Sequence, residues 1–215
     1  MSVDLREFCS PVENQGALGS CTANALAGNI EFLDEKNGGG YQDASRLFIY
    51  YNERVLEHTP DTDSGAMLRD GIKTLHEQGV SSEAHWPYNI KRFSIKPSPG
   101  CYKEAKLHCI DSYHRITTLD EMLTCLTEGF PFVFGFAVYE SFESQETART
   151  GIGQMPQKDE RMIGGHAVLA VGFNQKDKRF LVRNSWGTDW GMNGYFTIPF
   201  EYLEALADDF WTIRK

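Results

Sequence analysis

The spacing of apolar residues changes partway along the chain, and this change restricts the fold more than any other feature of the sequence. Before about residue 105, apolar side chains recur at helical intervals, as in Leu26, Ile30 and Leu33. Beyond that point, short continuous apolar runs such as residues 132–138 are typical of buried strands. The sequence therefore predicts an α+β protein, with a mostly helical lobe followed by a mostly β lobe.

The first half contains three helical patterns with recognisable ends. The first covers residues 22–36 and stops at the Asn-Gly-Gly-Gly run 37–40; the second covers about 45–57; the third follows Ser64 and stops at Gly79. A Thr-Leu-Asp-Glu capping box at residues 118–121 predicts the start of a fourth helix. The Pro-rich residues 96–100 are predicted to be a crossover between the two halves.

Four apolar runs predict strands in the second half, at residues 132–138, 166–173, 180–183 and 195–198, with a hairpin turn at 175–178. We expect one domain over residues 1–215. Its helical lobe is expected at about 10–105, and its β lobe at about 106–215 together with the N-terminal residues. The seam between two such lobes is expected to form a cleft.

Charge and hydropathy argue against two classes of partner. The net charge of the 215-residue chain is −9 and no run of Lys and Arg occurs, so we expect no nucleic-acid partner. No stretch of 18 apolar residues occurs, so we expect no membrane span. The first residues do not form a secretory signal. We expect a cytoplasmic protein if Met1 is the true start, and otherwise one secreted after processing.

The cysteines leave the disulfide state open and do not predict a metal centre. Five is an odd number, so at least one thiol is not paired within the chain. Cys101 and Cys109 lie near His108 and His114, but their spacing does not match the usual zinc patterns. Buried thiols or a disulfide are the preferred interpretations there. We expect no metal and no cofactor.

Cys21 is the candidate nucleophile, because it directly precedes a helical pattern and follows the run Gln-Gly-Ala-Leu-Gly-Ser. The positive end of a helix dipole favours the thiolate over the thiol. A free thiol has a pKa near ~8.5, and an imidazolium partner can lower it to about 3–4. Without such a partner, a cysteine in this position is more often a small apolar core residue.

His166 and Asn184 are the candidate base and its orienting amide. His166 opens an apolar strand, where a histidine needs a polar partner. The preceding Gly164 and Gly165 are expected to let another backbone approach closely. Asn184 ends another predicted strand, and its carbonyl oxygen is expected to accept a hydrogen bond from one ring nitrogen, leaving the other for the thiol.

Further groups complete this constellation. Trp186 and Trp190 are expected to exclude water from the His–Asn bond. The Gln15 side-chain amide is expected to donate to a developing oxyanion, alongside the backbone N–H of Cys21.

Motifs along nearly the whole chain resemble those of the papain family of cysteine peptidases, and most closely its bacterial members. They are Gln15-Gly16 with Gly19-Ser20-Cys21, Ser64-Gly65-Ala66, Trp86-Pro87-Tyr88, Gly165-His166-Ala167-Val168, and Asn-Ser-Trp-Gly-x-x-Trp-Gly-x-x-Gly-Tyr-Phe from Asn184. The last is the most specific. The resemblance implies a papain-like two-lobed fold whose second lobe is an antiparallel, barrel-like β structure, with the active site in the cleft.

The resemblance also implies a role for each residue. Cys21 is then the nucleophile, His166 the general base and acid, Asn184 the orienting residue and Gln15 the oxyanion donor. The implied substrate-binding residues are Gly65, Ala66, Met67, Leu68, Gly165 and Trp186. Among these, Gly65 is expected to offer backbone hydrogen bonds, Met67 and Leu68 to border an apolar pocket, and the Gly165 carbonyl to meet the substrate backbone.

The chain also departs from the family pattern. Leu18 replaces a cysteine that eukaryotic members carry three residues before the nucleophile, so the characteristic family disulfide cannot form. Thr22 replaces the aromatic residue that follows the nucleophile, and Gly165 replaces an acidic or amide residue. No catalytic group is lost by these changes.

We therefore interpret the chain as a cysteine endopeptidase. It is expected to be monomeric, to act on peptide or protein substrates, and to be controlled by a protein inhibitor or a missing pro-segment. Two alternatives remain open. One is an acyl transferase or deamidase acting on proteins, and the other is a papain-like binding domain that has lost catalysis.

Overall fold

Four helices dominate the first half of the chain and six of the seven strands lie in the second half, and the predicted α+β class is confirmed. The computed structural model describes residues 1–215 and divides them into two units. The helical unit contains residues 8–10, 15–114 and 213–215. The β unit contains residues 1–7, 11–14 and 115–212.

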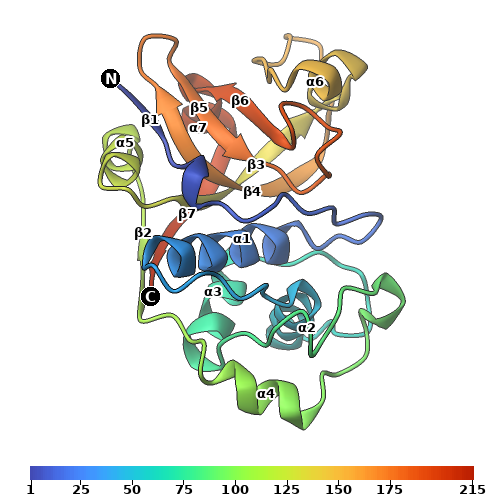
Figure 1. Cartoon of the computed structure of the whole chain (residues 1–215). Coiled ribbons are helices and arrows are strands. Elements are labelled where there is room, and N and C mark those ends of the chain that lie inside the picture. Colours follow the sequence, from blue (N-terminus) through green and yellow to red (C-terminus); the bar gives the residue numbers. More distant parts are fainter. The chain divides into compact units, whose positions relative to one another are not determined.

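Three helices pack on one another in the helical unit (Figure 1): α1 (Cys21–Lys36), α2 (Arg46–Leu56) and α3 (Leu68–Glu77). Their apolar faces supply fully or almost fully buried side chains, among them Leu26, Ile30, Phe48 and Ile72. The three helices predicted from apolar spacing are thus confirmed. Burying one such side chain contributes about 1.5–3 kcal/mol to folding.

The Pro-rich residues 96–100 overlap the start of the short helix α4 (Pro99–Ala105). Pro99 occupies the first turn of that helix. A proline is tolerated there because the N–H that it lacks has no intrahelical partner at that position. Two short 3₁₀ turns, η1 (Arg6–Phe8) and η2 (Ile90–Arg92), lie in the first half of the chain.

The strands form a seven-stranded sheet with the order β2-β7-β3-β4-β5-β6, and β1 pairs with β4 off this path. Their bounds are β1 (Ser2–Asp4), β2 (Ser112–Arg115), β3 (Phe132–Tyr139), β4 (Met162–Asn174), β5 (Arg179–Arg183), β6 (Tyr195–Pro199) and β7 (Ala207–Arg214). The remaining elements are α5 (Leu119–Thr127), η3 (Glu140–Glu143), α6 (Gln145–Thr150) and α7 (Phe200–Leu206). Strands β3, β4, β5 and β6 lie side by side (Figure 1) and pair antiparallel.

Strand β4 is the centre of the β unit, because it pairs with β1, β3 and β5. The turn predicted at residues 175–178 joins β4 to β5 and is confirmed. Aromatic side chains fill the core beside β4. Phe136 of β3 lies opposite His166 in the register, with ring centroids 5.8 Å apart.

Strand β4 also begins four residues before the predicted start, since residues 162–165 pair with the end of β3. The close backbone approach expected at the two glycines is absent. A Cβ atom at Gly164 would have no neighbour within 4 Å, and one at Gly165 would meet only the Phe136 carbonyl oxygen at 3.9 Å. None of the helices combines the length and the apolar character needed to cross a lipid bilayer.

Candidate functional site

His166 and Asn184 meet in the β unit, as the sequence predicts. His166 lies within β4 and Asn184 directly follows β5, and the register between these strands brings the two residues together. The Nε2 atom of His166 is 2.8 Å from Oδ1 of Asn184. Both residues are buried, with 7% and 3% of their surfaces exposed.

The neighbouring backbone determines which ring nitrogen carries the proton. The N–H of Ser185 donates to the same Asn184 Oδ1, at 2.8 Å. A backbone N–H can only donate, so the shared atom is an acceptor and His166 Nε2 must be its second donor. The neutral ring therefore carries its proton on Nε2 and presents the lone pair of Nδ1 as a base.

Trp186 covers this pair from one side. Its ring stacks on the imidazole of His166 with centroids 4.7 Å apart and an interplanar angle of 19°. Trp190 meets Trp186 edge-on at 5.1 Å, and Phe142 contacts both indoles. This aromatic cluster excludes water from one face of the imidazole.

Burial also determines the charge of the ring. Burial lowers the pKa of His166 to about 4, because a buried imidazolium loses its hydration, and the hydrogen bond with Asn184 offsets only part of this effect. The Asn184 Nδ2 group is buried and makes no hydrogen bond. The surroundings thus keep His166 neutral at neutral pH unless a negative charge lies close to it.

Cys21 is the first residue of α1 in the helical unit and is partly exposed. The helix is 16 residues long and has no acidic residue in its first turn. Its N-terminal peptide dipoles therefore favour a negative charge on the thiol, and the first turn itself contributes no carboxylate that would oppose this effect.

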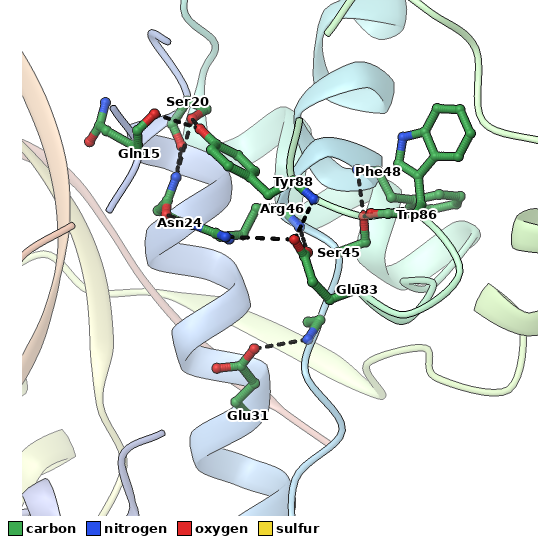
Figure 2. Close-up of polar contacts among 11 residues, drawn as sticks. Gln15, Ser20, Asn24, Glu31, Ser45, Arg46, Phe48, Glu83, Trp86 and Tyr88 are labelled. Carbon is green, nitrogen blue, oxygen red and sulfur yellow. Dashed lines mark hydrogen bonds and ion pairs between the residues drawn. The ribbon is translucent and has the colours of Figure 1, made fainter. Parts of the chain in front are cut away.

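The loop that leads into Cys21 is held by side chains of the same unit. The amide of Gln15 donates to the Leu18 carbonyl at 2.9 Å, and the Tyr88 hydroxyl donates to the Gln15 carbonyl at 2.8 Å. The hydroxyl groups of Ser20 and Tyr88 are 2.6 Å apart. Figure 2 shows how Tyr88 lies against both ends of this loop, beside Gln15 and Ser20.

Tyr88 is itself held by Arg46 and Glu83, which form an ion pair with 3.6 Å between nitrogen and oxygen. The Arg46 guanidinium lies 3.9 Å from the centre of the Tyr88 ring, and Glu83 accepts from the Tyr88 backbone N–H (Figure 2). Arg46 also donates to Asn24, whose amide binds the Ser20 carbonyl. Burial raises the pKa of Tyr88, so its hydroxyl keeps its proton and remains a donor. The sequence marks this residue only through the Trp-Pro-Tyr motif.

The expected substrate-binding residues of the helical unit differ in availability. The backbone N–H of Gly65 already donates to the Tyr50 hydroxyl at 3.1 Å, and its carbonyl accepts from Ser64. The Gly65 N–H is thus engaged within the chain, and its contact with a substrate stays a prediction. The next residue, Ala66, has a partly exposed backbone whose N–H and carbonyl make no hydrogen bonds in the chain.

The other expected contact residues differ in exposure. Met67 is 57% exposed, whereas Leu68 is buried at the start of α3. In the β unit, Gly165 is exposed next to His166 in β4. Met67 and Gly165 are therefore accessible to a ligand, whereas Leu68 is buried.

The cysteines form no disulfide bond. No group of three or more His, Cys, Asp or Glu side chains is placed to bind a metal ion. Within the β unit the structure brings together His166, Asn184 and Trp186. Within the helical unit it joins the loop carrying Gln15 to the helix that begins at Cys21.

Comparisons with known proteins point to one family. The family model described as papain family cysteine protease matches residues 1–203. A peptidase C1-like protein of Acanthamoeba polyphaga mimivirus is 51% identical over 99% of this chain and 72% of its own length. Pro-cathepsin H of Mus musculus is 28% identical over 88% of this chain, which spans 56% of that protein.

Solved structures agree with this assignment. Xylellain, a cysteine protease from Xylella fastidiosa, matches with a TM-score of 0.92 and 44% identity, covering all of this chain and 85% of that one. A Carica candamarcensis cysteine protease, solved with E-64, matches with a TM-score of 0.75 at 21% identity, covering 100% of this chain and 98% of its own. The second likeness shows the fold alone. Together with the family match, these results confirm the expected papain-like fold.

Proposed function

Because the chain belongs to the papain family of cysteine proteases, we propose that it hydrolyses peptide bonds with Cys21 as nucleophile, His166 as general base and acid, Asn184 as orienting residue and Gln15 as oxyanion donor. The observation that carries the proposal is the hydrogen-bond pattern at Asn184. It puts the imidazole proton on Nε2 and leaves Nδ1 as the basic nitrogen. A second observation supports it, namely that the Cys21 thiol lies at the N-terminus of a 16-residue helix.

In the acylation step, Nδ1 of His166 takes the proton of the Cys21 thiol. The sulfur attacks the peptide carbonyl carbon, and the electron pair of the C=O bond moves to oxygen. The oxyanion accepts from the backbone N–H of Cys21 and from the Gln15 side-chain amide, which also donates to the Leu18 carbonyl. The tetrahedral species collapses when the imidazolium protonates the leaving amine.

In the deacylation step, His166 takes a proton from water and the resulting hydroxide attacks the thioester. The carboxylic acid leaves, and the sulfur recovers its proton from the imidazolium. The thiolate and the imidazolium stabilise each other. Because burial lowers the pKa of His166, the competing state is the uncharged thiol beside the uncharged imidazole. The two groups titrate as a coupled pair.

For substrate binding, we propose that an extended peptide pairs with the backbone N–H and carbonyl of Ala66, because these groups are unpaired. Met67 is exposed beside them and offers an apolar surface for a substrate side chain. Gly165 presents its backbone next to the base in β4, and Trp186 shields the imidazole. The substrate class is therefore a peptide or an extended protein segment.

The proposal is tested by turnover of a fluorogenic peptide amide. Cys21→Ala is expected to abolish turnover, and His166→Ala to lower kcat by about 10²–10⁴-fold. Asn184→Ala is expected to be milder than His166→Ala, because it removes orientation and leaves the base. Cys109→Ala is the matched control and should keep wild-type turnover. Retention of wild-type turnover by folded Cys21→Ala protein would rule out this nucleophile.

A further inference from the structure

Asp63 joins two segments of the helical unit that are distant in the chain. Its carboxylate accepts a hydrogen bond from the backbone N–H of Gly19, two residues before Cys21, at 3.0 Å from Oδ1 and 3.3 Å from Oδ2. The same Oδ1 accepts a hydrogen bond from the Tyr50 hydroxyl at 2.5 Å. One exposed carboxylate thus binds both the loop that leads into Cys21 and helix α2.

Tyr50 extends this connection to the substrate-binding segment. Its side chain is fully buried, and its hydroxyl oxygen accepts the N–H of Gly65 at 3.1 Å. Burial and the hydrogen bond to Asp63 both raise the pKa of Tyr50, so the hydroxyl stays protonated and donates to the carboxylate. The resulting chain of hydrogen bonds runs from Gly19 through Asp63 and Tyr50 to Gly65.

Both ends of this chain depend on glycine. A Cβ atom at Gly19 would lie 3.0 Å from Asp63 Oδ1 and 3.6 Å from the Gly65 nitrogen. Gly65 has φ +71°, a left-handed conformation that residues with a side chain rarely adopt. The two segments therefore approach each other closely at these glycines.

A buried arginine supports the loop that carries Asp63. The Arg54 guanidinium donates to the carbonyls of Pro60 and Thr62, at 2.6 and 2.9 Å, and to that of Phe93 at 2.5 Å. It also lies 4.0 Å from the centre of the Tyr50 ring. Arg54 thus fixes the backbone just before Asp63, and this backbone directs the Asp63 carboxylate to Gly19.

We propose that Asp63 and Tyr50 are positioning residues. They fix the peptide-binding backbone of Ala66 relative to the loop that leads into Cys21. We call Asp63 and Tyr50 the clasp. No disulfide bond joins the two segments, and the hydrogen bonds of the clasp that join them do not depend on redox conditions. The inference rests on the proposed function of Cys21 and Ala66. It adds that substrate alignment depends on two residues that touch neither the substrate nor the reacting atoms.

The test separates substrate alignment from thiol chemistry. Asp63→Ala is expected to lower kcat/KM for an extended peptide amide about tenfold, chiefly through KM, since it removes both hydrogen bonds of the carboxylate. The rate of Cys21 alkylation by iodoacetamide, which does not use Ala66, should stay at the wild-type value. Asp63→Asn should recover part of the lost kcat/KM, because its amide oxygen still accepts.

Tyr50→Phe provides an independent variant that keeps the ring in place. It should raise KM to a similar degree, and combining it with Asp63→Ala should add little, because both act through one chain of contacts. Asp61→Ala, two residues away in the same exposed loop, and Tyr51→Phe, the next residue of α2, are matched controls expected to match wild type.

Two results would overturn the clasp. One is a wild-type KM in both Asp63→Ala and Tyr50→Phe. The other is an equal fall in peptide turnover and in alkylation, which would indicate general loss of structure. Failure of the underlying function is seen separately, as turnover by Cys21→Ala. If that variant is inactive and the clasp variants behave as wild type, only the clasp is wrong.

Discussion

At the scale of single residues, the proton position on His166 follows from a neighbour that does no chemistry. Ser185 contributes only its backbone N–H, but this donor makes Asn184 Oδ1 an acceptor and so assigns the imidazole tautomer. The sequence predicts the His–Asn pair from two strand ends. The hydrogen bond from Ser185 depends on the backbone geometry after β5, which the sequence does not show.

A pH prediction follows for His166 when no thiolate is near. In Cys21→Ala protein, His166 is expected to titrate near pH 4, because burial disfavours the imidazolium. The unfolded chain, with an ordinary pKa near ~6.5, takes up the proton first, so stability is lost as pH falls from about 6.5 to 4, by up to about 3 kcal/mol. Above pH 6.5 this residue should not change stability.

NMR titration of the His166 ring in Cys21→Ala measures this pKa directly. In the wild-type protein the proposed thiolate should raise it. A titration near pH 6.5 in the variant would contradict the role given to burial, and identical values in both proteins would contradict the coupling to Cys21.

Other residues near the site were not predictable from the sequence, because their partners are far away in the chain. Tyr88 binds a carbonyl 73 residues before it, and Asp63 binds an N–H 44 residues before it. Neither residue type indicates such a contact, since a Tyr after a proline and an Asp in a polar loop are ordinary. Only the folded helical unit shows which backbone groups they meet.

At the scale of elements, the sequence predicts those whose apolar spacing is sustained over several residues, such as α1, α2, α3, β3 and β5. It misses short elements whose stability comes from tertiary pairing. Strand β1 has three residues and exists through its pairing with β4. Strand β7 contains Asp208 and Asp209, and Asp209 has φ +57°, so its pairing with β3 is irregular and its sequence does not alternate.

Helix α5 offers a test of a local signal that the sequence predicts correctly. The Thr118 side chain accepts from the Glu121 N–H, and the Glu121 side chain accepts from the Thr118 N–H. Thr118→Ala is expected to lower the free energy of unfolding by about 1 kcal/mol, because it leaves an N–H of the first turn without its partner.

Chemical denaturation of Thr118→Ala, compared with Thr124→Ala, measures this effect. Thr124 is an exposed residue inside α5 and caps no helix start, so its loss should matter less. Equal stability of Thr118→Ala and wild type would show that the box contributes nothing in this context. Peptide turnover should be unchanged in both variants.

At the scale of the whole molecule, the proposed catalytic groups are divided between the two units. Cys21 and Gln15 belong to the helical unit, and His166 and Asn184 belong to the β unit. The order of motifs along the chain predicts this division, since the nucleophile precedes the first helix and the base lies in a strand. The family match extends across both units, over residues 1–203.

The central proposal is that His166 activates the Cys21 thiol. It is tested most directly by the pH dependence of Cys21 alkylation by iodoacetamide, read by mass spectrometry on the peptide that contains Cys21. In the wild-type protein, alkylation should remain fast well below pH 8, the range in which an ordinary thiol with a pKa near ~8.5 becomes unreactive. In His166→Ala, reactivity should fall off as for an ordinary thiol. Superimposable profiles for the two proteins would contradict the claim.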